Sequence, residues 1–391
     1  MAFSSSVLRL IGALLLFVCG VHCEHVQYRL RRGEIPSRGV NLGSWLVAEH
    51  WMSYESPLWD GVPKDIALRG EYATMQFLGD TRGYAAFEKH RAMWITEADI
   101  KVIADAKLNL VRVPVGFWIT NDYRPPSTDN IPPSRPQEQV YARGAMKYLD
   151  RLITKWSVKY NVAVMLSLHA HKGSQNGFDH SSLKDFGSAI WSNSQANVDN
   201  SVKFATFLAN RYKNSPAFLG MNLMNEPHYP TNPETVKSYY TRTYNKIRAT
   251  GNDCVLAVSP MLTEQGAGHM IDFMRWPAYY NVWHEFHKYY IWGLEGASEN
   301  NIMDAVRSYR YDTIDAWQGN WLLVGEWCMD STASAPFESQ ESFRAFGKAQ
   351  LEGYNRAHSG WTFWSWRHSD ELTKRSGWSM RQLLKDGDLV L

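Results

Sequence analysis

The chain has 391 residues, of which 45% are hydrophobic and 20% charged, and 41 basic against 39 acidic residues give a formal net charge of +2. This composition excludes a disordered or fibrous protein, and a near-neutral chain lacks the positive charge that drives binding to nucleic acid or anionic membranes. Aromatic residues reach 14%, including 17 Trp and 20 Tyr. Flat aromatic faces suit sugar rings, although any single Trp more often fills the core.

The N-terminus has the pattern of a secretory signal peptide. A basic residue precedes an apolar run over residues 10–18, and small residues follow as far as Gly20 and Cys23. Such a run is too short to span a bilayer. We therefore expect residues 1–23 to be a signal peptide, cleaved after Gly20 or Cys23. Residues 24–391 would form one mature domain, exported to the cell wall or medium without a membrane anchor.

Eight short apolar or β-branched runs recur along the chain, separated by long amphipathic stretches. The predicted strands are 38–45, 109–115, 162–169, 218–227, 254–260, 281–289, 321–327 and 360–366. Amphipathic stretches predict helices at 96–106, 145–160, 197–213 and 235–250, among others. Eight strand–helix units predict an α/β protein whose parallel strands close into a single-domain (β/α)8 TIM barrel. An open doubly wound sheet is the alternative, but GVNLGSW after the first strand is not its Gly-rich phosphate-binding turn.

Polar side chains gather where the predicted strands end. They are Arg112, His169, Asn225, Glu226, His284, His287, Tyr289, Glu326 and Trp364. A structural hydrogen bond explains any one of them. A barrel is filled with apolar side chains, however, and each buried group left unpaired would cost about 1–3 kcal/mol. The whole set at one end therefore indicates a functional site.

Two carboxylates in this set suggest the chemistry. Glu226 and Glu326 end the fourth and seventh predicted strands and should face each other across the barrel mouth. Glycoside cleavage needs such a pair, one to protonate the leaving oxygen and one to meet the oxocarbenium-like centre. A separation of about 5–5.5 Å fits retention, and about 6.5–9.5 Å fits inversion. Arg112 should keep one carboxylate ionised, whereas the acid needs a niche that raises its pKa.

Other hydrolytic chemistries fit less well. His284 and His287 are three positions apart on a predicted strand and should point to opposite faces, so we expect no metal site and no cofactor. The sequence has no GxSxG motif for a Ser nucleophile, and nothing marks Cys328 as an activated thiol. Cys254 and Cys328 are predicted at opposite ends of the barrel, so we expect them to be unpaired with each other.

Seven segments, in chain order, resemble glycoside hydrolase family 5, a family of retaining β-glycosidases built on (β/α)8 barrels. They read RGVNLGSW, NLVRVPVGFW, LSLHAHKGSQNGFD, NEP, HKY, GEW and GWTFWSW. The tail GWSMRQLLKDG also resembles that of the exo-β-1,3-glucanase branch. The resemblance covers nearly the entire chain after residue 38.

The resemblance implies a role for each matching polar residue. Glu226 would be the acid/base and Glu326 the nucleophile. Arg112 and Tyr289 would contact the nucleophile, and Asn225 would bind the sugar 2-hydroxyl.

The resemblance also implies the walls of the sugar site. The residues that would line it are His169, His287 and Trp364 around the cleaved sugar, Glu49 and Asp179 on the terminal glucose, and Phe178 and Trp292 at the entrance for the next sugar. The chain departs from the branch at residues 170–172, 222 and 228, and at His180, where the branch has Asn. These positions lie on the leaving-group or terminal-sugar side, where His180 would contact substrate.

We therefore expect a secreted, monomeric, retaining hydrolase that releases glucose from the non-reducing end of β-1,3-glucan. A broader β-glucosidase and an endo-β-glucanase of the same family remain open. A non-catalytic glucan-binding barrel is the alternative from another functional class.

Overall fold

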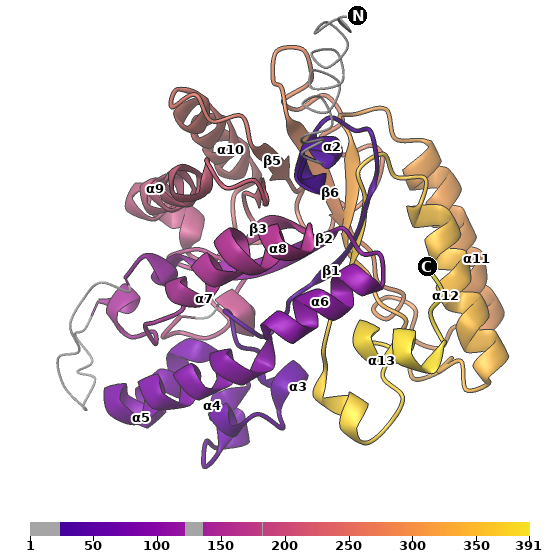
Figure 1. Cartoon of the computed structure of the whole chain (residues 1–391), viewed down its shortest axis with the longest axis horizontal. Helices are drawn as coiled ribbons and strands as arrows, with labels where there is room; N and C mark the ends of the chain where they lie inside the picture. Colours follow the sequence, from indigo (N-terminus) through magenta and orange to yellow (C-terminus); the bar gives the residue numbers. More distant parts are fainter. Residues whose placement is uncertain (1–23, 122–135, 182) are drawn as a thin grey trace, which may run out of the picture.

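The structure is a computed structural model that describes residues 24–121, 136–181 and 183–391. The predicted signal peptide, residues 1–23, lies outside the described residues. Eight parallel strands pair in chain order, and the eighth pairs with the first to close a barrel (Figure 1). The strands are β1 Ser37–Asn41, β2 Leu110–Gly116, β3 Ala163–Ala170, β4 Phe218–Asn222, β5 Val255–Val258, β6 Val282–His287, β7 Leu322–Glu326 and β8 Gly360–Phe363. The predicted (β/α)8 barrel is confirmed, and the open sheet is excluded.

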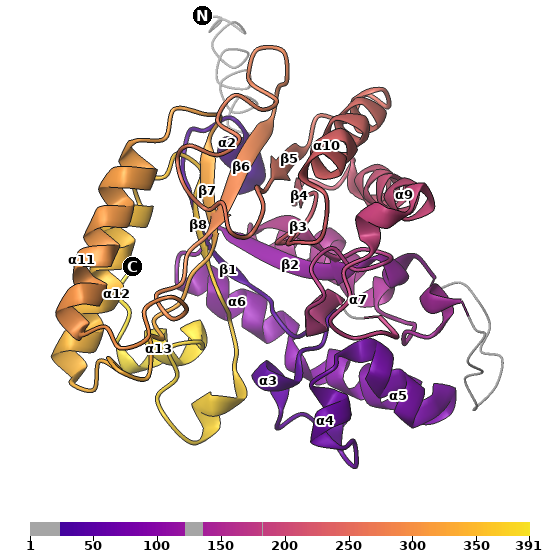
Figure 2. The ribbon, with the colours of Figure 1, turned by 180° about the vertical axis from the view of Figure 1, so that it is seen from behind.

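Helices surround the barrel on its outer face (Figures 1 and 2). They are α2 Val26–Arg31, α3 His50–Ser53, α4 Lys64–Ala67, α5 Glu71–Trp94, α6 Glu97–Asp105, α7 Met146–Arg151, α8 Ser157–Tyr160, α9 Gln195–Tyr212, α10 Pro233–Arg248, α11 Glu299–Tyr309, α12 Gln340–Tyr354 and α13 Met380–Asp386. Short 3-10 turns occupy Pro57–Trp59, Phe117–Asn121, Gln137–Gln139, Asp179–Ser181, Trp191–Asn193 and Ser369–Leu372. None of the helices in the described part of the chain is long and apolar enough to cross a membrane.

The predicted elements differ from the observed ones mainly at their ends. The predicted helix 145–160 is α7 and α8 joined by a π-helical turn, Leu152–Trp156. The predicted strand 218–227 ends at Asn222, although the amide of Asn225 still donates to Leu168 of the neighbouring strand. Apolar periodicity therefore continued past the strand ends into the loops that build the barrel mouth.

The amino-terminal end of the barrel is sealed by α2. Val26 and Leu30 of this helix belong to a buried apolar cluster with residues near the strand starts, among them Leu110, Ala163, Leu219, Val255, Trp283 and Leu323. Burying one aliphatic side chain contributes about 1.5–3 kcal/mol. The apolar floor leaves the carboxyl end of the strands as the open face.

Cys254 and Cys328 are both buried free thiols, as predicted. Their burial raises the pKa of each thiol. A thiol held protonated in an apolar environment is a poor nucleophile.

Glu71, the first residue of α5, makes the stability of the fold depend on pH. Its carboxylate is buried and accepts a hydrogen bond from the amide of Ala48 at 2.8 Å. Burial raises its pKa from 4.5 to about 7, against the opposing effects of Arg91 and the Ala48 amide. The folded state therefore favours the protonated acid, so the contribution of Glu71 to stability is highest below pH 4.5 and falls as the pH rises from 4.5 to 7. Above pH 7 the raised pKa of Glu71 lowers the free energy of unfolding by about 3 kcal/mol relative to its value at low pH.

We predict that Glu71→Gln, which keeps the acceptor for Ala48, stabilises the protein at pH 8 by up to about 3 kcal/mol and has little effect at pH 4. Chemical denaturation at the two pH values measures this difference. Glu341→Gln, an exposed position on α12, is the control. A gain of equal size at both pH values would show that the ionisation of Glu71 is not the cause.

Candidate active site

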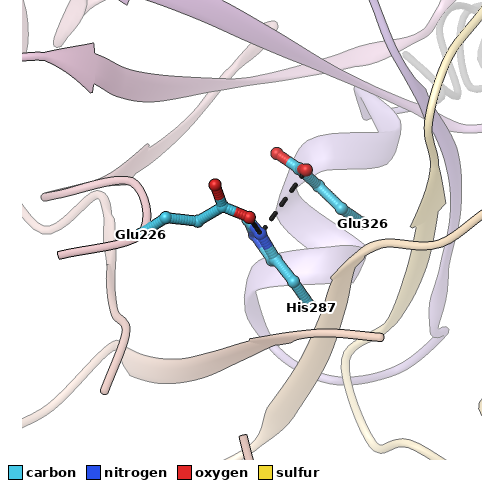
Figure 3. A group of neighbouring side chains, drawn as sticks. All are labelled: Glu226, His287 and Glu326. Atoms are coloured by element: carbon cyan, nitrogen blue, oxygen red, sulfur yellow. Dashed lines mark hydrogen bonds and ion pairs between the residues drawn. The ribbon is translucent and has the colours of Figure 1, made fainter. Parts of the chain in front are cut away.

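Glu226 and Glu326 face each other at the carboxyl end of the barrel, with a carboxylate oxygen of one within 4.8 Å of a carboxylate oxygen of the other (Figure 3). Glu326 is the last residue of β7. Glu226 follows β4 by four positions and has a left-handed φ of +44°. Such a φ is uncommon for a residue with a Cβ and is retained where surrounding contacts hold it. Here the side-chain amide of Asn176 donates to the Glu226 carbonyl at 3.1 Å.

Arg112 on β2 connects the buried polar groups beneath this pair. Its side chain is fully buried. Nη1 donates to Glu326 Oε1 at 2.8 Å and to Asn41 Oδ1 at 2.9 Å. Nη2 donates to Asn225 Oδ1 at 2.9 Å and forms an ion pair with Glu285 Oε1 at 2.7 Å. A buried guanidinium needs several acceptors to offset its lost hydration, and this site supplies four.

Tyr289 fixes the second oxygen of Glu326. Its hydroxyl donates to Oε2 at 2.8 Å. Burial raises the pKa of Tyr289 well above its ordinary value, so the hydroxyl remains a donor at neutral pH. The ring also packs against Trp292 and Trp378, with centroid distances of 5.5 and 5.6 Å. Both oxygens of Glu326 are therefore held in place.

His287, the last residue of β6, contacts three carboxylates, two of which, Glu226 and Glu326, are drawn with it in Figure 3. Nδ1 is 2.8 Å from Glu226 Oε1 and 3.4 Å from Glu326 Oε2. Nε2 is 3.1 Å from Glu285 Oε1. Burial alone would lower the pKa of His287, but Glu326 and the hydrogen bonds to Glu226 and Glu285 raise it to about 10. The ring is an imidazolium at neutral pH.

The pKa directions of the carboxylate pair differ from those expected from the sequence. Burial is the largest single effect on Glu226 and would raise its pKa, but the hydrogen bond to His287 and the charges of His287, His180 and Arg112 together outweigh burial and lower the pKa. At Glu326, burial outweighs His287 and Arg112 and raises the pKa. The expectation of a raised pKa at the acid was wrong because the sequence did not show that His287 contacts Glu226. Glu226 and His287 consequently share a proton that resides on the imidazole.

A cavity of about 630 Å³ opens above these groups. Its lining includes most of the residues proposed from the sequence: Glu49, His169, Phe178, Asp179, His180, Glu226, His287, Tyr289, Trp292, Glu326 and Trp364. The other two, Arg112 and Asn225, are fully buried and join the site through Glu326 and His169. The structure thus brings all thirteen side chains to one end of the barrel. A concave site with aromatic walls and a few convergent polar groups is typical of small-ligand binding.

Glu49 and Asp179 form a second pair of acids in the cavity wall. Glu49 Oε2 accepts a hydrogen bond from Trp51 Nε1 at 2.9 Å. Burial, followed by the neighbouring charge of Asp179, raises the pKa of Glu49 well above its ordinary value. Burial also raises the pKa of Asp179. A protonated carboxyl both donates and accepts hydrogen bonds, which matches the hydroxyl groups of a neutral sugar.

His169 of β3 and the loop after β3 place aromatic side chains near Glu226. The rings of His169 and His180 are 4.7 Å apart, and His169 stacks on Trp364 at 5.5 Å. His180 Nε2 lies 3.8 Å from Glu226 Oε2. Phe178 contacts His180 at 5.7 Å and is 38% exposed. This loop therefore joins the surroundings of Glu226 to the cavity opening.

Several residues of the site were missed from the sequence. They are Asn41, Trp51, Leu262, Gln265, Glu285, Lys288, Tyr309 and Trp378. Glu285 shares a strand face with His287, since the two are separated by two positions, and this periodicity could have revealed it. Trp51 and Trp378 lie outside the strands, where no periodic pattern indicates the direction of a side chain.

Glu226, His287 and Glu326 also have the residue types of a metal site, with potential ligand atoms within 4.8 Å of one another. A ligating imidazole must be neutral. With its pKa raised to about 10, His287 would have to lose a proton to bind a cation at neutral pH. His284, by contrast, packs against Trp317 with ring centroids 5.0 Å apart, so the two strand histidines have different environments.

A closed parallel barrel with two facing carboxylates in an aromatic-walled cavity is the architecture of a glycoside hydrolase. The model of the family described as cellulase (glycosyl hydrolase family 5) matches residues 73–370. This chain belongs to that family.

Curated relatives and solved structures extend the comparison. The chain is 27% identical over 396 residues to the glucan 1,3-beta-glucosidase of Schwanniomyces occidentalis, covering 89% of this chain and 86% of the relative. It is 28% identical to the probable glucan 1,3-beta-glucosidase A of Emericella nidulans, covering 90% and 89%. Rutinosidase from Aspergillus niger has a similar fold, with a TM-score of 0.74 at 17% identity, covering 91% of this chain and 98% of that one.

We predict that Arg112→Met destabilises the protein by about 3–5 kcal/mol at pH 8, because it leaves buried carboxylates without their cation. The loss should be smaller at pH 5, where unpaired carboxyls with raised pKa values are protonated. Thermal and chemical unfolding at both pH values test this. Arg307→Met on the exposed side of α11 is the control. An equal loss at both pH values would point to packing rather than charge.

Proposed function

We propose that this chain is a retaining hydrolase that releases glucose from the non-reducing end of β-1,3-glucan. The observation that carries the proposal is the approach of Glu226 and Glu326 to within 4.8 Å. This spacing is close to the separation of about 5–5.5 Å that suits direct attack and leaves no room for a water between the carboxylates. The curated glucan 1,3-beta-glucosidases to which the chain is similar support the choice of substrate.

In the first half-reaction, Glu326 attacks the anomeric carbon while Glu226 gives a proton to the departing glycosidic oxygen. The bond to the leaving sugar breaks as an ester bond to Glu326 forms. Arg112 and Tyr289 each hold one oxygen of Glu326, which fixes the direction of attack. Asn225, held by Arg112, would bind the 2-hydroxyl, where a hydrogen bond strengthens in the transition state.

In the second half-reaction, water replaces the leaving sugar. Glu226 takes a proton from this water, whose oxygen attacks the anomeric carbon and releases Glu326 as a carboxylate. Two inversions at the same carbon give net retention. The proton gained by Glu226 replaces the one that it donated, so the site returns to its initial state.

The cavity walls support exo action. Glu49 and Asp179 would bind the terminal glucose and close the cavity behind it. His169, His180, His287 and Trp364 would surround the cleaved sugar. Phe178 and Trp292, which are 38% and 66% exposed, would offer aromatic faces to the next sugar. A ring bound on such a face gains contact through its apolar C–H groups, while its hydroxyls remain in water.

We also propose that the chain is exported to the cell wall or medium as a monomer and that residues 1–23 are removed as a signal peptide. The support is the pattern of that segment and the position of α2, which begins at Val26. Cleavage after Gly20 or Cys23 leaves the helix that seals the barrel intact.

We predict that Glu326→Ala loses turnover of an aryl β-glucoside by at least about a thousandfold, because no other group can form the covalent intermediate. Binding of laminari-oligosaccharides, measured by calorimetry, should persist. Azide, a small external nucleophile, should restore turnover and give an α-glucosyl azide. The control is Glu341→Ala on α12. Equal turnover by Glu326→Ala and wild type would refute the assignment and indicate a different nucleophile, whereas a wild type without turnover would favour a non-catalytic barrel.

We predict that laminarin yields glucose alone, with the β-anomer appearing first in a proton NMR time course. Retention follows from the short distance between the carboxylates, and glucose follows from a cavity closed by Glu49 and Asp179. A ladder of oligomers would indicate an endo-β-glucanase. Initial α-glucose would require a site wide enough for water between the carboxylates.

A further inference from the structure

A third carboxylate, Glu285, lies on β6 beneath the pair and is fully buried. One oxygen, Oε1, is 2.7 Å from Arg112 Nη2 and 3.1 Å from His287 Nε2. Both cations of the site thus share a single acceptor. The mechanism described above assigns Glu285 no role.

Glu285, His287 and Glu226 form a continuous chain. Nε2 of His287 faces Glu285 at 3.1 Å, and Nδ1 faces Glu226 Oε1 at 2.8 Å. An imidazole that meets a carboxylate at each nitrogen can donate at both only when it is doubly protonated. A proton on Nδ1 is then one hydrogen bond away from Glu226.

The space for Glu285 depends on the residue before Glu326. A Cβ at Gly325 would lie 2.2 Å from Glu285 Oε1 and 2.5 Å from its Cδ. Any side chain at this position would collide with the carboxylate of Glu285. The Gly of the GEW segment therefore allows the third carboxylate to sit directly beneath the second.

The charges around His287 come from every side of the barrel mouth. Three carboxylates face it, and Glu226, Glu285 and Glu326 all act to raise its pKa. Arg112 Nη2 lies 3.5 Å from Nε2 and opposes a charge on the ring. His180 lies 3.8 Å from Glu226 Oε2, and His169 contacts the side chain of Asn225 at 3.4 Å. Among these groups, only Glu285 contacts Nε2 with a negative charge.

We propose that Glu285 is a positioning residue that keeps His287 doubly protonated, so that the pair of His287 and Glu226 holds the proton used for acid catalysis. The proposal rests on the acid/base role proposed for Glu226. In the first half-reaction the proton passes from Nδ1 to Glu226 Oε1 and on to the leaving oxygen, leaving neutral His287 with its remaining proton on Nε2 toward Glu285. In the second, the proton that Glu226 takes from water returns to Nδ1, so protons balance over the cycle.

The test is the pH dependence of kcat/KM for Glu285→Gln and Glu285→Asp. Removing the negative charge of Glu285 lowers the proton affinity of the pair of His287 and Glu226. The alkaline limb of the kcat/KM profile of Glu285→Gln should therefore move to lower pH by about one unit or more. Glu285→Asp retains the charge and should stay near wild type. At pH values above both limbs, Glu285→Gln should lose about tenfold or more in kcat/KM on a phenyl glucoside relative to wild type. It should lose less on a dinitrophenyl glucoside, whose leaving group needs no proton.

An unmoved alkaline limb in folded Glu285→Gln would overturn the inference. If this variant does not fold, nitrogen NMR of the wild type decides, with the His287 signals identified by their loss in His287→Gln. Both ring nitrogens should carry protons at pH 8, and a neutral ring would overturn the inference. Failure of the proposed function is distinguishable, because it appears as undiminished turnover by Glu326→Ala.

Discussion

The candidate active site depends on the balance between two buried cations and three carboxylates, of which Glu285 and Glu326 are buried and Glu226 is partly exposed. Arg112 and His287 lie among Glu226, Glu285 and Glu326, and the contacts that join the cations to the carboxylates are between 2.7 and 3.4 Å long. In a medium of low polarity, removal of one partner leaves a charge without hydration or a counterion. The groups therefore act as one unit, and the protonation of each depends on the others. For this reason, the pKa of one carboxylate cannot be derived from its own surroundings alone.

The barrel supplies the rigidity that this balance requires. Arg112, Glu285, His287 and Glu326 lie on strands β2, β6 and β7, which are tied to their neighbours by the closed ladder. Glu226 alone lies on a loop, and its left-handed backbone is held by Asn176. Glu326 is thus placed by regular structure, whereas Glu226 is placed by a side-chain contact from the loop after β3. That loop also carries Phe178, Asp179 and His180, so its conformation connects the position of Glu226 with the shape of the cavity.

The sequence predicted the barrel well because the relevant signals are local and repeated. Each strand has its own apolar run, and polar residues at the run ends indicate the functional face. The proposed site residues were found at these ends or by resemblance. Glu285 was missed because only its two-residue spacing from His287 marked it in the sequence, and its partner Arg112 comes from a strand far away in the sequence. The pKa of Glu226 was misjudged for the same reason, since it depends on a contact across the barrel. Trp378 comes from the C-terminal segment, whose path over the mouth follows from tertiary hydrogen bonds, such as Ser365 N to Trp378 O.

Burial has opposite consequences at the two ends of the cavity. At the reacting end, cations accompany the carboxylates, and the result is a set of fixed charges suited to stabilising an oxocarbenium-like centre. At the end formed by Glu49 and Asp179, burial is the largest effect and raises both pKa values. Neutral or proton-sharing carboxyls there can exchange hydrogen bonds with sugar hydroxyls at little desolvation cost. The two ends differ because, among the carboxylates of the cavity, Arg112 and His287 contact only those at the reacting end. These two side chains therefore organise the proposed chemistry, and they also distinguish the reacting end from the end proposed to recognise the terminal sugar.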